Sequence, residues 1–133
     1  MVALIEGENR LDVSLVAIPP TRPAYLNGAL VGDILYYGVG QWSTTRNWYY
    51  NMRSLARFPI KNTGTVRAPV GIDFMGVREA VYLNPGQSTN WEITVQPLQG
   101  TNTYEYKIIV ADPDTGIFWT AQTGSLTITG VYF

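Results

Sequence analysis

The chain of 133 residues contains neither cysteine nor histidine. Without cysteine it can form no disulfide, no thiolate metal site and no cysteine nucleophile. Without histidine it has no side chain that titrates near neutral pH unperturbed, no imidazole ligand and no ordinary serine–histidine catalytic pair. These absences predict that the protein is not an enzyme and that it uses no cofactor and no metal.

Charged residues are also scarce, at 14% of the chain with a net charge of -1, against about 25% in an average soluble domain. Such a chain has no long-range field that would attract nucleic acid or an anionic membrane. No apolar run approaches the ~20 residues of a membrane span. The apolar run at residues 2–5 is shorter than the roughly 7 to 15 residues of a signal-peptide core. We therefore expect no nucleic-acid partner, no membrane partner and no export signal.

Residues 58–74 alternate apolar and polar side chains on both sides of a turn at residues 62–65. Alternation of this kind is typical of strands with one buried face. The pattern predicts two strands that form a hairpin-like pair in the middle of the fold. The side chains expected in the core are Phe58, Ile60, Ala68, Val70, Ile72 and Phe74.

Further short strands are expected along the rest of the chain, separated by turns rich in Gly, Pro, Asn and Asp. Turn signals spaced by about 8 to 12 residues are typical of sandwiches and barrels. The sequence therefore predicts an all-β, antiparallel β-sandwich of about seven to nine strands. The remaining strands are expected at 25–39 (two short strands or one with a bulge), 77–83, 89–98, 103–111, 117–120 and 125–133.

Two stretches carry a family resemblance. The pair KNTGTVRAPVGIDF and VYLNPGQSTNWEITV, within residues 60–95, resembles the CARDB-like group of adhesion-type immunoglobulin-like domains, in which an N-x-G turn joins two core strands and an L-x-P-G turn opens the next. EGENRLDVSLVAIPP resembles the closing strand of carboxypeptidase-regulatory-like surface modules. The resemblance implies an Ig-like β-sandwich at residues 24–133 without catalytic residues. Similar domains occur in cell-surface arrays and in decoration or fibre proteins of phage particles.

Residues 1–23 are expected to form an N-terminal strand or arm followed by a stiff spacer. The strand at 11–18 alternates, and the spacer PPTRP at 19–23 is polyproline-like, at ~3.1 Å per residue. Such a strand could fold back on its own sandwich or pair with a neighbouring copy. We expect residues 1–20 to dock between subunits, which would bury Leu11, Val13 and Leu15 in the partner.

The segment QWSTTRNWYYNMR at 41–53 lacks clean alternation and is expected to be a long loop. Its rings could close the end of the core, anchor a protein interface or stack on sugars. We expect a contact surface made of Trp42, Trp48, Tyr49 and Tyr50. Tyr132 and Phe133 would be costly to leave in water and are expected to pack on a neighbouring strand or subunit.

Other candidate residues favour structural roles. Trp91 and Trp119 are expected in the core. Asp112 and Asp114 lie two apart in a turn, but calcium needs about 6 to 8 oxygen ligands, so a plain turn is expected. Asp73 and Glu79 have no spacing that indicates a glycosidase pair.

These observations favour a non-enzymatic structural protein of an assembled particle, such as a capsid decoration, cement or fibre protein of a phage or virus. Its expected partners are copies of itself and a capsid or other particle protein, with carbohydrate as a possible ligand. Its expected location is the virion or another extracellular particle. The alternative is an adhesin-like or carbohydrate-binding module at the cell surface.

Overall fold

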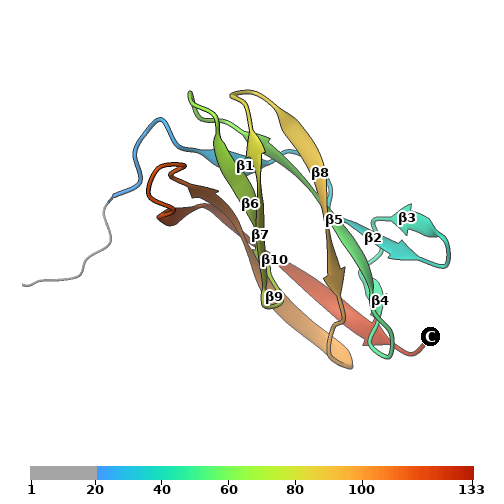
Figure 1. Ribbon diagram of the computed structural model, residues 1–133. Coiled ribbons are helices and arrows are strands. Elements are labelled where there is room, and N and C mark those ends of the chain that lie inside the picture. The colour runs from blue at the N-terminus through green and yellow to red at the C-terminus, as the bar shows by residue number, and fades with distance from the viewer. Residues whose placement is uncertain (1–20) are drawn as a thin grey trace, which may run out of the picture.

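The computed structural model describes residues 21–133, which form ten strands and no helix (Figure 1). The expected strand at 11–18 lies outside the described residues, so the arm with Leu11, Val13 and Leu15 stays a prediction. Nothing in the described part is a helix long and apolar enough to cross a membrane. The all-β architecture predicted from alternation is confirmed.

The first sheet is centred on β5, which has β8 along one edge and both β1 and β2 along the other. β3 lies outside β2, so the hairpin β2–β3 forms one corner of this sheet. All of these pairings are antiparallel. The bounds are β1 Gly28–Leu30, β2 Leu35–Gly38, β3 Gln41–Ser43, β5 Ser54–Asn62 and β8 Ser88–Val95.

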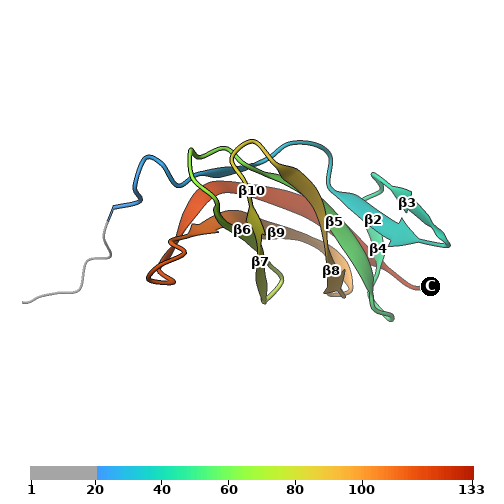
Figure 2. The same cartoon turned by 45° about the horizontal axis from the view of Figure 1, so that its top comes forward.

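The second sheet has the order β4-β10-β9-β6-β7 and packs against the first. Its pairings are antiparallel except that β4 runs parallel to the last residues of β10. Figures 1 and 2 both show the C-terminus and the β2–β3 hairpin at one end of the molecule, away from the blue segment that precedes β1. The bounds are β4 Asn47–Tyr49, β6 Ala68–Phe74, β7 Val77–Leu83, β9 Gly100–Ala111 and β10 Phe118–Val131.

The alternation at residues 58–74 predicted the buried faces of two strands correctly, but the prediction that these strands pair with each other is wrong. All six expected core side chains are buried between the sheets. However, β5 and β6 belong to opposite sheets, so residues 63–67 cross the sandwich and no hairpin forms. Alternation indicates which face of a strand is buried. The same pattern arises in a hairpin and in two strands of opposite sheets, so it cannot distinguish them.

The buried side chain of Asn62 joins the two turns that carried the family resemblance. Its Nδ2 donates hydrogen bonds to the carbonyl oxygens of Val66 (2.9 Å) and Leu83 (2.8 Å). Its Oδ1 accepts a bond from the Gly64 amide at 2.8 Å, and its carbonyl accepts one from the Gly86 amide at 2.8 Å. The N-x-G and L-x-P-G turns therefore form one hydrogen-bonded unit at this end of the sandwich.

Two expectations for the remaining strands need correction. Residues 41–53 are not one long loop, because they contain β3 and β4. Residues 117–133 were expected to hold two strands separated near Gly124, but β10 is continuous and only shifts its register between Thr120 and Gln122. Gly124 lies under the ring of Tyr106, where a Cβ would come within 2.2 Å of the hydroxyl oxygen. The glycine thus makes room for a ring and does not end the strand.

Candidate functional site

Trp48 lies in the core and not on a contact surface. It is fully buried and stacks on Tyr36, with ring centroids 4.7 Å apart and an interplanar angle of 9°. Its Nε1 donates a hydrogen bond to the carbonyl of Thr45 at 2.9 Å. The expectation that Trp48 forms an interface is therefore wrong, and the reading of this ring as the closure of the core is confirmed.

Trp42 lies half-buried on the outer face of the first sheet. The guanidinium carbon of Arg57 lies 4.0 Å from its ring centroid, and Tyr37 meets it edge-on at 5.1 Å. Arg57 also forms an ion pair with Glu92 at 2.7 Å. One face of the Trp42 ring is thus covered by the protein itself, which leaves less of it for a partner.

The aromatic residues of β4 meet those that follow β10. The Tyr49 and Phe133 rings are 4.8 Å apart, edge to face, and the Tyr50 and Tyr132 rings are 6.1 Å apart. The Phe133 amide also donates to Oδ1 of Asn51 at 2.8 Å. Nevertheless Tyr132 is 74% exposed and Phe133 is 60% exposed. These two residues contact a neighbouring strand, as expected, but most of their surface still faces solvent.

The tip of the β2–β3 hairpin projects an apolar side chain into solvent. Its two-residue turn has φ of 47° at Val39 and 79° at Gly40, and Val39 is 75% exposed. Turns of this kind favour Asn or Gly, because both residues take positive φ. A β-branched residue there costs about 1 to 3 kcal/mol. The sequence therefore keeps an apolar group at this tip against its conformational preference.

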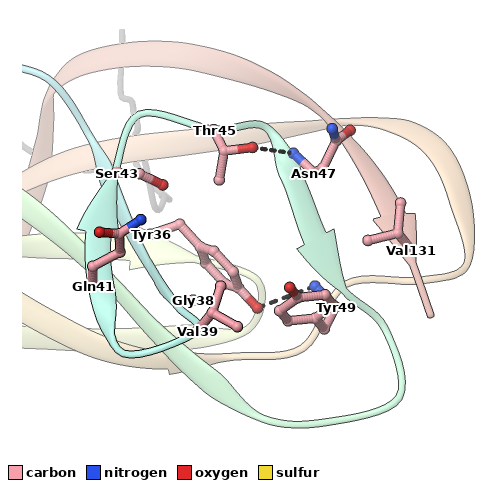
Figure 3. A pocket seen from close by; sticks show the side chains of 9 residues that line it. All are labelled: Tyr36, Gly38, Val39, Gln41, Ser43, Thr45, Asn47, Tyr49 and Val131. Carbon is pink, nitrogen blue, oxygen red and sulfur yellow. Dashed lines mark hydrogen bonds between the residues drawn. The ribbon is translucent and has the colours of Figure 1, made fainter. Parts of the chain in front are cut away.

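Two hollows lie on either side of this tip. The polar pocket, of about 270 Å³, opens between β3 and β4 (Figure 3), and the apolar pocket, of about 250 Å³, lies between the hairpin and Phe133. The polar pocket is lined by Tyr36, Gly38, Val39, Gln41, Ser43, Thr45, Asn47, Tyr49 and Val131. The apolar pocket is lined by Tyr37, Gly38, Val39, Gly40, Tyr49, Met52, Ser54 and Phe133.

Arg46 fixes the loop between β3 and β4. Its Nη1 donates to the carbonyls of Ile34 at 3.0 Å, Thr44 at 3.1 Å and Thr45 at 3.3 Å. Burial lowers the pKa of the Arg46 guanidinium from its ordinary value, and the charge of Asp33 opposes this shift. The guanidinium remains cationic, as arginine does in proteins. The guanidinium thus binds these three carbonyls, and no charged side chain among residues 21–133 lines either pocket.

The acidic residues with candidate roles serve turns and cross-strand contacts. Oδ1 of Asp112 accepts hydrogen bonds from the amides of Asp114 (2.8 Å) and Thr115 (3.3 Å), as in an ordinary Asx turn. Asp73 pairs with Arg78 at 3.3 Å. Within residues 21–133, no three His, Cys, Asp or Glu side chains are placed to hold a metal ion.

Trp91 and Trp119 contribute to the core only in part. Both are partly buried and pack against the core cluster. The Nε1 of Trp91 donates to Oε1 of Glu79 at 3.1 Å on the surface. The expected core role is thus confirmed in part, because both rings pack against the core and neither is fully buried.

Metal removal is expected to leave the protein unchanged. One carboxylate oxygen of Asp112 accepts hydrogen bonds from its own turn. Too few free oxygens therefore remain in this turn to bind calcium. The melting temperature should be the same in EDTA and in added calcium, measured by circular dichroism on the full chain. A rise in melting temperature with calcium would show that a metal site exists.

Sequence reasoning missed Val39 and Met52 at the apolar pocket and Gln41, Ser43 and Asn47 at the polar pocket. A Val-Gly pair between two short alternating runs was the available signal for the hairpin and its tip. No local pattern indicates that this tip meets β4 and Phe133, because that contact depends on how the two sheets pack.

Comparison with known proteins gives a likeness in fold. No family model matches the chain, and no curated protein matches it. The chain is similar to the crystal structure of the CARDB domain of a Pyrococcus furiosus protein, which was solved in complex with di-metal ions. The two are 14% identical, the match covers 85% of this chain and 100% of that one, and the TM-score is 0.49. The likeness is to the group that the two turns resemble, and it concerns the fold alone.

Proposed function

We propose that the protein is a non-catalytic structural module that associates with copies of itself through one end of its sandwich. The observation that carries this proposal is an exposed apolar surface, here named the end patch. It consists of Tyr37, Val39, Met52, Tyr132 and Phe133, each between 37% and 75% exposed. Four of them also line the apolar pocket. Apolar surface gathered in one place is typical of a contact site.

The shape of the end patch favours a second copy of the chain as its partner. Val39 projects from the hairpin tip directly beside a hollow lined by Met52 and Phe133. In a twofold dimer each tip can enter the hollow of the other copy, since a twofold interface uses the same surface twice. The net charge of -1 opposes this only weakly.

The assembly that we propose is a particle, in which the protein serves as a decoration, cement or fibre protein of a phage or virus. The support comes from a composition with few charges and many neutral polar residues, and from the exposed apolar end patch. A second contact through residues 1–20 would extend the assembly. The alternative of an adhesin-like or carbohydrate-binding surface module draws its support from the polar pocket.

Val39→Asn is expected to separate association from stability. Asparagine suits the positive φ of the tip, so the free energy of unfolding should rise by about 1 kcal/mol. The same change removes the apolar group from the end patch and should convert an oligomer into a monomer. Size-exclusion chromatography with light scattering measures the mass, and urea unfolding at a concentration where both proteins are monomeric measures the stability.

The matched control is Val31→Asn, because Val31 is 48% exposed and lies outside both pockets. It should leave the oligomer intact. A wild-type chain that stays monomeric at high concentration would refute self-association. An oligomer that survives Val39→Asn would show that another surface is responsible.

A further inference from the structure

The polar pocket has the features of a built ligand site. Figure 3 shows Gln41 and Ser43 of β3 on one side and Thr45 and Asn47 on the other, with the Tyr36 ring between them. The first two belong to one sheet, whereas Asn47 belongs to the other, so the pocket lies at the mouth between the sheets. A ligand there would contact both layers of the sandwich.

Several polar groups around this pocket have unused hydrogen-bonding capacity. Within the described part of the chain, the side chains of Gln41, Ser43 and Asn47 make no hydrogen bond. The Tyr36 hydroxyl accepts a bond from the Tyr49 amide at 3.1 Å and keeps its proton for donation. The mouth therefore offers two amides and two hydroxyls that can both donate and accept.

The charge of the pocket limits the class of ligand. No charged side chain lines it, and the Arg46 guanidinium is occupied by the carbonyls of Ile34, Thr44 and Thr45. An anionic or cationic ligand would lose hydration without gaining an opposite charge. The ligand that fits is neutral and carries both donors and acceptors.

The volume of the polar pocket and its aromatic lining limit the class of ligand further. The volume of about 270 Å³ lies just below the range of about 300 to 1,000 Å³ that is usual for small-molecule sites. The half-buried Tyr49 supplies a ring beside the polar groups, whereas the Tyr36 ring is buried against Trp48 and offers only its hydroxyl. A pyranose ring matches this combination, because it presents C–H groups to an aromatic side chain and hydroxyls to amides.

We infer that the polar pocket binds a single neutral sugar ring, either free or at the end of a glycan. This site is distinct from the end patch, although Gly38, Val39 and Tyr49 line both pockets. Self-association and sugar binding can therefore be tested with different residues. Gln41 and Asn47 line the polar pocket alone, and Met52 lines the apolar pocket alone.

The test is a nuclear magnetic resonance titration of the full ¹⁵N-labelled chain. The probes are the methyl pyranosides of glucose, galactose, mannose and N-acetylglucosamine, together with the charged analogues glucuronic acid and glucosamine. At least one neutral probe should shift the side-chain amide signals of Gln41 and Asn47. The double variant Gln41→Ala/Asn47→Ala should weaken its binding about tenfold, since each lost hydrogen bond accounts for a factor of about 2 to 12.

Met52→Ala is the matched control and should leave the sugar affinity unchanged. Gln41 and Asn47 are exposed, so their variants should keep a dispersed amide spectrum. The inference is overturned if no neutral probe shifts these signals, if the double variant binds as tightly as the wild type, or if a charged analogue binds better than its neutral counterpart.

Discussion

Trp48→Ala is expected to lower the free energy of unfolding by about 3 to 5 kcal/mol, as for other buried aromatic residues. The change removes the ring that stacks on Tyr36 and meets Phe74 edge-on at 6.2 Å. It also leaves the carbonyl of Thr45 without the Nε1 donor. A cavity would open beneath the polar pocket, between the two sheets. Urea unfolding followed by tryptophan fluorescence and circular dichroism measures the loss.

Trp42→Ala and Trp91→Ala are the controls for ring size. Trp42 is half-buried and covered on one face by Arg57, and Trp91 packs only partly against the core. Each should lose about 1 to 2 kcal/mol. Trp48→Phe keeps a ring but loses the hydrogen bond and part of the side-chain volume. Its loss of stability should therefore lie between those of Trp48→Ala and Trp42→Ala. Equal losses for Trp48→Ala and Trp42→Ala would contradict the buried position of Trp48.

Asn62→Ala is expected to cost about 3 to 4 kcal/mol, although it removes only a small side chain. The change leaves the carbonyls of Val66 and Leu83 and the amide of Gly64 without their partner. Each unsatisfied buried group costs about 1 to 3 kcal/mol, and water entering the vacated space offsets part of the sum. The loss should be measured by urea unfolding. Hydrogen exchange should quicken at residues 62–66 and 83–87 together, because the side chain joins both turns.

Asn62→Asp tests the role of the Asn62 side-chain amide as a hydrogen-bond donor, and Asn90→Ala is the control. A carboxylate at 62 would face two carbonyl oxygens, so its pKa should be raised in the folded state. The variant should therefore be destabilised at neutral pH and recover as the pH falls through that raised pKa. Asn90 is exposed on β8 and its replacement should change stability by less than about 0.5 kcal/mol. If Asn62→Ala costs no more than Asn90→Ala, the bridging role is refuted.

The sequence predicted the faces of the long strands well and their partners poorly. Alternation identified the buried sides of β5, β6 and β9, because each strand is long enough to show a period of two. It could not show that β5 and β6 lie in opposite sheets. It also failed for β3 and β4, which have three residues each. For this reason the sequence pattern does not show that Trp48 is buried.

The sequence identified only part of the candidate site. Aromatic composition pointed to Tyr49, Tyr50, Tyr132 and Phe133, and these rings do lie together. Val39 and Met52 carry no such compositional signal. They join the end patch only because a hairpin of the first sheet meets β4 and the end of β10 in the second. Contacts of this kind depend on sheet packing, which no local sequence pattern encodes.

The parallel pairing of β4 with the end of β10 has a consequence during protein synthesis. Asn51 and its partner Phe133 are separated by 82 residues. Ribosomes add about 5 to 20 residues per second, so about 4 to 16 s pass between the translation of the two. Throughout that interval the rings of Trp48 and Tyr49 have no completed second sheet to pack against. Newly made chains of this protein should therefore bind chaperones through the β4 segment until β10 has left the ribosome.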